Sequence, residues 1–301
     1  MKLYNENMCA RAISQYNKNA VRQFVMSIDV DGWPSLLRFY SVDHDPSEAD
    51  RQVDCADGIL KLVGLFEKHD VKATFFVTGE MAQKHPSAVR TIIGMGHEVS
   101  CHGLYHGRNE CLLSGEEQKA QIEKAIRILK DITGQTPLGF RAPCLRANKT
   151  TLKVLSEIGF LYDSSFSSMF IPTYYGSVAS PHFKPYHPLS GNSDLLEIPV
   201  SGNPLAPLPL SGSWMRNLGL SWVKFGIKTL FKMGCPVMFY VHPRDILPLP
   251  RVSGVPWHLY PNTGKRCLKM LDELLEYVKR LNGQMLRAID LAMNVKSQEN
   301  S

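Results

Sequence analysis

The sequence predicts an α/β fold, a distorted or incomplete (β/α) barrel of about seven parallel strands with a loop-rich insertion. Three observations predict it. Short apolar runs alternate with segments of helical period, the connections between them are short, and 301 residues with 44% apolar side chains are enough for one large core. Seven or so strand–helix units on one continuous core suggest a barrel or an incomplete barrel.

The first third of the chain carries three strand-like runs. The expected elements are a strand at 22–29, a polar stretch at 32–50, a helix at 53–69, a strand at 71–79, a helix at 86–95 and a short strand at 97–101. The helix at 53–69 rests on apolar residues at helical spacing, whereas the strands are continuous runs rich in Phe, Val and Ile. These runs predict buried strands.

The rest of the chain continues the alternation around one irregular region. Ser114 and Glu117 form a capping box that begins a helix. Further expected elements are strands at 137–143, 160–165, 195–200 and 235–241, and helices at 150–159 and 263–281. The organisation predicted is an N-terminal extension at 1–21, one domain at 22–293 with a Pro- and Gly-rich insertion and substrate-side region at 170–235, and a flexible tail at 294–301.

Composition narrows the function class. The formal charge of +6 comes from 34 basic and 28 acidic side chains, and the sequence contains no dense Lys/Arg run. This pattern argues against a nucleic-acid-binding protein, but the positive charge is compatible with an anionic partner. The seven cysteines are scattered and contain no Cys-x-x-Cys pair, which argues against a disulfide framework and for a reducing compartment. No stretch has the ~18–20 apolar residues of a membrane span. We therefore expect a cytoplasmic location.

Three short motifs lie where predicted strands end. Asp29 and Asp31 lie where the first strand ends, His102 and His106 follow the third, and His242 closes the strand at 235–241. In a parallel barrel the carboxyl ends of the strands meet at one rim, where active sites form. Two imidazoles and one carboxylate can hold Zn²⁺ or a similar ion with a position open for water, and the second carboxylate can serve as base.

Each motif alone also has an ordinary structural explanation. An Asp-x-Asp pair is commonly a solvated turn, a His-x-x-x-His pair commonly lies on a surface helix, and a single histidine is commonly a hydrogen-bonded core residue. Their joint placement at strand ends is what favours a site.

The motifs together resemble those of the polysaccharide deacetylase family, which carries the NodB homology domain of carbohydrate esterase family 4. The resemblance spans about 22–290 and rests on SIDVDG, KATFFVTGE, GHEVSCHGLYH, GFRAP and VMFYVHP. The segments YDSS, LLEIPVS, PLSGSWMR and FYVHPRDILPLPR are most similar to the subgroup tied to exopolysaccharide loci.

The resemblance implies a role for each matching residue. Asp31, His102 and His106 would bind one divalent metal, with Zn²⁺ favoured and Co²⁺, Ni²⁺ or Fe²⁺ as alternatives. Asp29 would be the general base, kept ionised by Arg141, and His242 the general acid. The backbone N–H of Cys144 would stabilise the oxyanion. Many members carry a tyrosine where this chain has Cys144, so the local pocket is expected to differ.

Substrate contacts are less sharply indicated. Trp214 and Arg216 resemble the subgroup's substrate-side loop, where an aromatic ring suits a sugar face and an arginine suits a phosphate or carboxylate. A packed core tryptophan explains Trp214 equally well. Asp163 could bind substrate or tune His242, or simply end a strand. Asp245 could pair with Arg244 or cap a turn.

The resemblance implies a metal-dependent hydrolase that removes an N-acetyl group from an amino sugar of a polysaccharide or lipid-linked glycan. The alternatives are a deformylase or cyclic imide or ureide amidohydrolase on the same fold, and a catalytically silent carbohydrate-binding protein. The segment 220–233 carries Lys224, Lys228 and Lys232 on one helical face. This segment could contact an anionic membrane at its inner face. Alternatively, it is a barrel helix with a lysine-rich outer side, and we favour this second interpretation.

Overall fold

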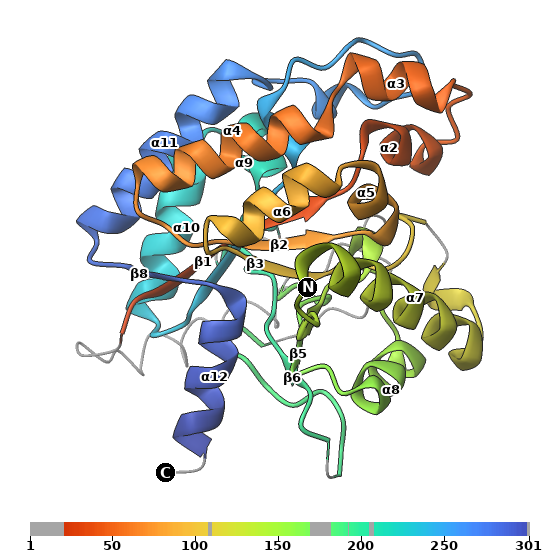
Figure 1. Ribbon diagram of the computed structural model, residues 1–301. Helices are drawn as coiled ribbons and strands as arrows, with labels where there is room; N and C mark the ends of the chain where they lie inside the picture. The colour runs from red at the N-terminus through yellow and green to blue at the C-terminus, as the bar shows by residue number, and fades with distance from the viewer. Residues whose placement is uncertain (1–20, 108–109, 169–181, 192, 205–207, 300–301) are drawn as a thin grey trace, which may run out of the picture.

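Parallel strands form one curled sheet in the computed structural model, which describes residues 21–107, 110–168, 182–191, 193–204 and 208–299 (Figure 1). The strands are β1 (Gln23–Val30), β2 (Thr74–Val77), β3 (Glu98–Cys101), β4 (Gly139–Phe140), β5 (Tyr162–Asp163), β6 (Leu196–Glu197), β7 (Val237–Val241) and β8 (Gln284–Leu286). Their order is β6-β5-β4-β3-β2-β1-β7, with β8 paired to β1, and all pairings are parallel. The predicted incomplete parallel barrel is confirmed.

The barrel is incomplete between β6 and β7. These two strands stand at opposite ends of the sheet order, and in the described part of the chain no strand pairing joins them. Backbone hydrogen bonds from the segment after β6 partly bridge the opening: the N–H of Ser201 donates to the carbonyl of Met238 at 3.0 Å, and Ser211 forms a parallel bridge with Tyr240. On the other side, β8 pairs with the start of β1 and β2 with its end.

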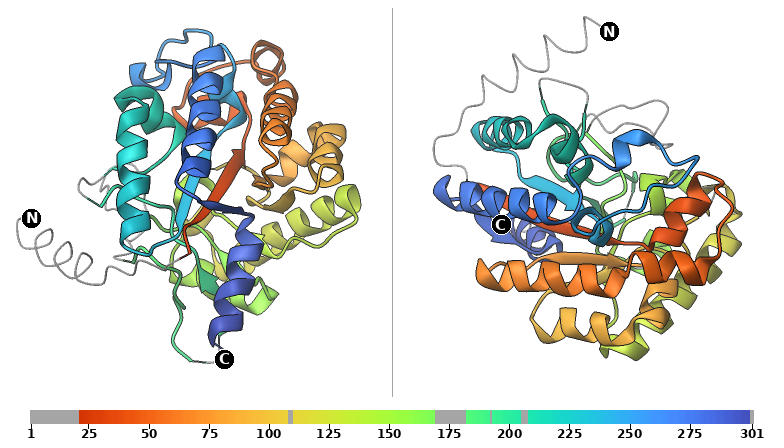
Figure 2. Two further views of the ribbon diagram at one scale, coloured as in Figure 1. Left: turned by 90° about the vertical axis from the view of Figure 1, so that its left-hand side faces the viewer. Right: turned by 90° about the horizontal axis from the view of Figure 1, so that it is seen from above.

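Helices cover the outside of the sheet (Figure 2). They are α2 (Trp33–Phe39), α3 (Pro46–Gln52), α4 (Cys55–Lys68), α5 (Gly79–Lys84), α6 (Pro86–Gly94), α7 (Gly115–Thr133), α8 (Lys149–Ile158), α9 (Gly212–Leu218), α10 (Leu220–Lys232), α11 (Lys265–Arg280) and α12 (Ala288–Glu299). The predicted capping box is present at α7, where the N–H of Glu117 donates to Ser114 Oγ at 3.3 Å. The helices expected at 53–69, 86–95, 150–159 and 263–281 correspond to α4, α6, α8 and α11.

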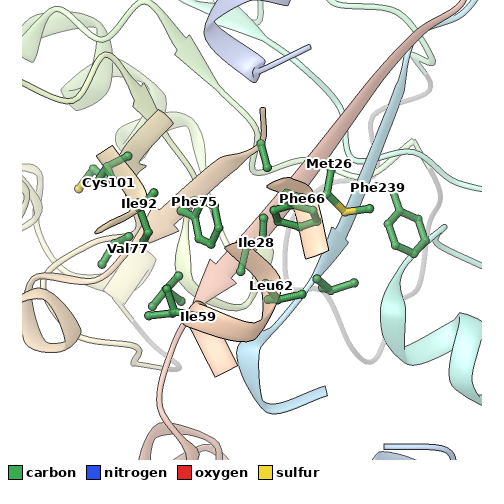
Figure 3. Packing of buried hydrophobic residues seen from close by; sticks show 14 of the residues in the cluster. Met26, Ile28, Ile59, Leu62, Phe66, Phe75, Val77, Ile92, Cys101 and Phe239 are labelled. Carbon is green, nitrogen blue, oxygen red and sulfur yellow. The ribbon is translucent and has the colours of Figure 1, made fainter. Parts of the chain in front are cut away.

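The main core lies between the sheet and these helices. Its members on α4 include Ile59, Leu62 and Phe66, all fully buried, which meet Ile28 of β1 and Phe75 of β2 (Figure 3). Alternate residues of β1 point the other way, so side chains on that side of the strand face the barrel interior. The apolar part of that interior includes Val25, Phe76, Tyr162 and Met238. Polar residues of β1, among them Ser27 and Asp29, lie on the same side of the strand and form part of the site described below.

The C-terminal helix α12 packs beside the start of the strands. Its first N–H groups donate to side chains of β2 and β3: Ala288 to Thr74 Oγ1 at 2.7 Å and Ile289 to Glu98 Oε2 at 3.1 Å. Ala288 and Leu291 are buried. Residues 294–299, which we expected in the C-terminal tail, form the last part of α12, and this helix begins from a buried and hydrogen-bonded first turn.

Two other regions are more regular than expected. The polar stretch at 32–50 forms α2 and α3, which share a small core with Leu247 and Leu259 from the loop after β7. The region 170–235 contains β6, α9 and α10, although residues 169–181, 192 and 205–207 lie outside the described part. Among the helices described, we find none whose length and apolar character would let it cross a bilayer.

Helix α10 uses its apolar face inside the protein. Val223, Ile227 and Leu230 are fully buried in the main core, whereas Lys228 and Lys232 are exposed. This arrangement agrees with the barrel-helix interpretation that we favoured.

Candidate active site

The two aspartates lie at the end of β1 and share one side of the strand. Because side chains alternate along a strand, Ser27, Asp29 and Asp31 point away from the helices that Ile28 contacts. Asp29 is 4% exposed and Asp31 is 1% exposed. Two nearly fully buried carboxylates require charged or hydrogen-bonding partners.

Arg141 is the partner of Asp29. It follows β4, and its side chain is fully buried. Its Nη1 donates to Asp29 Oδ1 at 2.7 Å and to Ser27 Oγ at 2.9 Å, while Ser164 accepts from Nε and Nη2 at 3.0 and 2.9 Å. Burial raises the pKa of Asp29, but the charge and hydrogen bond of Arg141, with smaller effects of His102 and His242, together outweigh burial, so this pKa lies below its usual value. Asp29 is held ionised and in a fixed direction.

His102 follows β3, and its ring nitrogen Nε2 has no hydrogen-bond partner. Its Nδ1 lies 2.7 Å from the carbonyl oxygen of Arg141. Since a carbonyl only accepts hydrogen bonds, Nδ1 must carry the proton and Nε2 the lone pair. His102 Nε2 is buried and has no hydrogen-bond partner, and burial lowers the pKa of the ring. A neutral imidazole with a free Nε2 is the form that binds a metal.

Asp31 and His106 face each other beside this nitrogen. Asp31 Oδ2 lies 3.5 Å from His106 Nε2 and has no hydrogen-bond partner, whereas Oδ1 accepts from Arg244 Nη1. The rings of His102 and His106 have centroids 5.4 Å apart. Burial lowers the pKa of His106 to about 4, so this imidazole is also neutral near pH 7.

These donors fit a divalent cation in their chemistry. Two neutral imidazoles and one carboxylate are an ordinary ligand set for zinc-type ions, and the unpartnered buried atoms Asp31 Oδ2 and His102 Nε2 are costly unless something binds them. As placed, however, no three Asp, Glu, His or Cys side chains in the described part of the chain already surround a point that could hold a metal. Closing the set would require small side-chain movements toward the ion.

His242 comes directly after β7, at the same end of the barrel. Its side chain is 16% exposed, and its ring meets Tyr240 edge-on with centroids 5.6 Å apart. After burial and Arg141, the charge of His242 is among the further influences on the pKa of Asp29, which places the ring near the base. Its Nδ1 lies 3.3 Å from Asp245 Oδ2. The structure thus brings the five residues of the predicted metal, base and acid set, together with Arg141, to one rim.

The partners of this set were largely missed from the sequence. Asp245 caps the turn that follows His242, as one of the two alternatives held, but it pairs with Arg216 and not with Arg244, which reaches Asp31. Two adjacent charged residues, one position beyond the strand-end histidine, were the available signal. Nothing in the sequence indicated which charge each would meet.

Cys144 lies in the turn after Arg141, with φ of 58° in the left-handed region. Its Sγ is 3.8 Å from His106 Nε2. Burial and the nearby Asp31 raise the pKa of the thiol to about 12, so it is protonated and not a ready nucleophile. The role of its backbone N–H in binding an oxyanion stays a prediction.

The three predicted substrate contacts lie in different surroundings. Trp214 is half-buried on α9. Arg216 is 1% exposed and ion-paired with Asp245 at 2.9 Å, so its guanidinium is already occupied inside the protein. Asp163 is fully buried, accepts from Ser165 Oγ at 2.5 Å and is paired in register with Glu197, not with His242. Neither charged group is placed to meet a substrate directly.

Comparison with known proteins agrees with this arrangement. The polysaccharide deacetylase family matches residues 52–162, and a domain of unknown function, DUF3473, matches residues 164–288. The first stretch includes His102, His106 and Arg141, the second includes His242, and Asp29 and Asp31 precede both.

Two of the similar proteins are named as deacetylases. The chain is 27% identical over 186 residues to a peptidoglycan deacetylase of Helicobacter pylori, an alignment covering 58% of this chain and 63% of that protein. It is 29% identical over 152 residues to a peptidoglycan-N-acetylglucosamine deacetylase of Bacillus cereus, covering 46% of this chain and 55% of the relative. The alignments thus span less than two thirds of the length of either relative.

The fold recurs in solved structures. A Mycobacterium smegmatis protein assigned to the polysaccharide deacetylases superposes with a TM-score of 0.68 at 21% identity, covering 94% of this chain and 93% of that one. The allantoinase Puue superposes with a TM-score of 0.66 at 20% identity over 93% and 92% of the two chains. By its matched sequence, this chain contains a polysaccharide deacetylase domain at residues 52–162, and the chain as a whole shares its fold with the solved structures above.

Proposed function

We propose that this chain is a metal-dependent hydrolase that removes an N-acetyl group from an amino sugar of a polysaccharide or lipid-linked glycan. One observation carries the proposal: Asp29 is held ionised by Arg141 beside the neutral His106 and two buried atoms without a hydrogen-bond partner, Asp31 Oδ2 and His102 Nε2. The deacetylase relatives support the reaction class.

The metal would be held by Asp31 Oδ2 and by the Nε2 atoms of His102 and His106, with Zn²⁺ favoured over Co²⁺, Ni²⁺ or Fe²⁺. When bound, such an ion polarises the acyl oxygen and makes a water molecule easier to deprotonate. The hydrogen bond from His102 Nδ1 to the carbonyl of Arg141 keeps the ring in the tautomer that this requires.

Asp29 and His242 would move the protons. Asp29 takes a proton from the attacking water, whose oxygen forms a bond with the acyl carbon. His242, in its protonated form, gives a proton to the sugar nitrogen as the C–N bond breaks. The products are acetate and a free amine. Asp29 then releases its proton to solvent, and His242 takes up a proton from solvent, which completes the cycle. Separate residues are needed because one carboxylate cannot accept and donate in the same step.

The remaining parts of the site would stabilise and position the substrate. The backbone N–H of Cys144 would donate to the oxyanion that forms on the acyl oxygen. Trp214 is the half-buried aromatic residue that we propose lies against a sugar ring. The net charge of +6 and the exposed Lys228 and Lys232 are compatible with a substrate on an anionic lipid carrier.

The test is acetate release from a panel of substrates. The panel contains N-acetylhexosamine oligomers, lipid-linked N-acetylated sugars, N-formylated sugars and a cyclic ureide. Metal-dependent acetate release from an N-acetylated sugar is the expected result. Turnover of the formyl or ureide compounds alone would reassign the reaction to another C–N hydrolase, and glycan binding with no turnover of any compound would indicate a binding protein.

A further inference from the structure

His242, the general acid proposed above, has a carboxylate beside its ring nitrogen Nδ1. Asp245 sits three residues after His242 in a tight turn that follows β7. Its Oδ2 accepts the backbone N–H of His242 at 2.9 Å and lies 3.3 Å from the ring Nδ1. A hydrogen bond at the long end of the usual range is common for catalytic groups without substrate.

Asp245 is itself fixed by a buried arginine from another element. Arg216 of α9 donates from Nη2 to Asp245 Oδ1 at 2.9 Å, and both side chains are within 2% of full burial. Burial raises the pKa of Asp245, but the charge of Arg216, the hydrogen bond with His242 and the charges of His242 and Arg244 together outweigh burial, so this pKa lies below its ordinary value. An ionised carboxylate can only accept, so the Nδ1 of His242 must be the donor.

Arg216 is tethered in turn to the loop after β7. Its Nη1 donates to the carbonyls of Leu259 at 3.0 Å and Pro261 at 2.8 Å, and its own carbonyl accepts from Asn262 Nδ2 at 2.6 Å. Three hydrogen bonds from the buried guanidinium and one to the backbone carbonyl leave the arginine little freedom. The arginine therefore holds Asp245 in one position and not in a range of positions.

The backbone at α9 makes room for the carboxylate. A Cβ added to Gly212, the first residue of α9, would lie 2.9 Å from Asp245 Oδ2 and 2.8 Å from Val241 Cγ1. A side chain at this position would push the Asp245 carboxylate away from His242. A glycine is thus required where the helix meets the turn.

We propose that Asp245 and Arg216 are positioning residues for His242. Asp245 keeps the Nδ1 proton of the ring directed inward, so Nε2 is the atom that passes a proton to the leaving nitrogen, and Arg216 keeps Asp245 ionised and in place. This inference rests on the deacetylase function proposed above. It assigns a role to the region matched by the domain of unknown function: that region supplies the proton-donating half of the site, while the preceding residues supply base and metal ligands.

Other charged groups near His242 do not fill this role. Asp29 and Asp31 face it from the end of β1, His106 from the loop after β3, and Arg244 from its own turn, and each of these contributes to the electrostatics of the rim. The ring nitrogen bonded to a carboxylate is nevertheless Nδ1, and the carboxylate is Asp245.

The experiment combines tautomer and rate measurements on the full chain. Protein labelled with ¹⁵N-histidine gives the tautomer of His242 by NMR, with the signal assigned from His242→Asn. We expect the Nδ1–H form in wild type and its loss in Asp245→Asn, because the amide can donate to Nδ1. The turnover number of Asp245→Asn should fall by about 100-fold or more with KM nearly unchanged, since misdirecting a catalytic histidine has effects of that size or larger.

Controls separate positioning from loosening of the fold. Asn217→Ala lies on the same helix and removes a bond to the same loop, at 2.8 Å to the carbonyl of His258, without touching Asp245. It should leave the tautomer unchanged. Arg216→Lys keeps a positive charge beside Asp245, whereas Arg216→Met removes it. The turnover number of Arg216→Lys should therefore be higher than that of Arg216→Met. If Asp245→Asn does not fold, Gly212→Ala displaces the carboxylate without removing it and is measured in its place.

A double mutant supplies the decisive outcome. In a His242→Asn background, Asp245→Asn should have no further effect on the residual rate. An unchanged Nδ1–H tautomer in Asp245→Asn, or effects that multiply in the double mutant, would overturn the proposal. Because the tautomer is measured without substrate, a wild-type protein that releases no acetate would defeat the proposed function while the NMR result still decides the positioning.

Discussion

Asp29 and Arg141 stand 112 residues apart in the chain and form a buried 2.7 Å ion pair in the site. The pair joins the end of β1 to the residue after β4, and Ser27 shares the same guanidinium nitrogen at 2.9 Å. A fully buried guanidinium with four acceptors fixes the direction of the carboxylate as well as its charge. This relationship is the basis for treating Asp29 as a base and not as a ligand.

Asp29→Asn should abolish turnover while leaving metal binding intact. The amide cannot accept a proton from water, so we expect a loss of about 10³-fold or more in the turnover number. Metal content of the purified variant should match wild type, because Asp31 and the histidines are untouched. Asp70→Asn, an exposed aspartate with φ of 50° that asparagine tolerates, is the control. Retained turnover in Asp29→Asn would remove the base assignment.

His102→Ala should lose metal and activity together. The substitution deletes a buried nitrogen with no other partner, and loss of one of three ligands weakens metal binding by orders of magnitude. The comparison is His187→Ala, a partly exposed histidine that contacts Glu299 at 3.2 Å. Metal per chain, measured by atomic emission after dialysis, should fall only in the first variant. Equal metal content in both would show that His102 is not a ligand.

The carboxyl pair Asp163 and Glu197 should make stability depend on pH. Burial raises the pKa of Asp163 to about 6, and burial with the neighbouring charge raises the pKa of Glu197 further. Between about pH 4 and the raised values, the folded state holds a proton that unfolded carboxylates lose. The free energy of unfolding should therefore decrease as pH rises, by on the order of 2 kcal/mol from about pH 5 to 8.

Glu197→Gln tests that pH dependence. The glutamine keeps the acceptor for the N–H of Phe166, which Glu197 Oε1 takes at 3.0 Å, and can donate to Asp163 without a titrating proton. Urea unfolding at several pH values should give a flatter profile than wild type. Parallel profiles would mean that the pair is not proton-sharing.

Gly139→Ala should destabilise the fold severely. A Cβ there would lie 2.0 Å from Tyr162 Cζ. The ring cannot withdraw easily, because its OH bonds Glu98 at 2.8 Å and Ser100 at 2.9 Å inside the barrel. We expect a loss of about 3 kcal/mol or more in the free energy of unfolding.

The same substitution on a helix gives the matched control. Gly64 lies on α4, and an added Cβ meets nothing within 4 Å. Gly64→Ala should therefore stabilise by about 0.5–1 kcal/mol through helix propensity. A thermal shift of the same sign for both variants would be inconsistent with the packing described at β4.

Local patterns in the sequence predicted most of the fold. The apolar runs at 22–29 and 235–241 became β1 and β7 because buried parallel strands need no polar face. Helices α2 and α3 and strand β8 were not predicted. Residues 32–50 look polar because only one side of two short helices is covered, and β8 is three partly exposed residues whose pairing with β1 is a long-range event.

The residues of the site divide along the same lines. Asp29 lies near the end of β1, and Asp31, His102, His106 and His242 follow strands, so parallel topology alone brings them together. Arg216 was misassigned because its partner, Asp245, is 29 residues away and the sequence carries no record of that contact. Buried ion pairs between distant segments depend on how the segments pack in three dimensions, and local sequence patterns do not predict that packing.

The most direct test of the central claim is a metal titration of metal-stripped protein with acetate release as the readout. The account predicts no release without metal, a rate that rises in proportion to bound Zn²⁺, and a plateau near one ion per chain with an N-acetylhexosamine oligomer or lipid-linked N-acetylated sugar as substrate. Acetate release at full rate from metal-free protein, or none from protein carrying one ion per chain on any N-acetylated sugar, would contradict it.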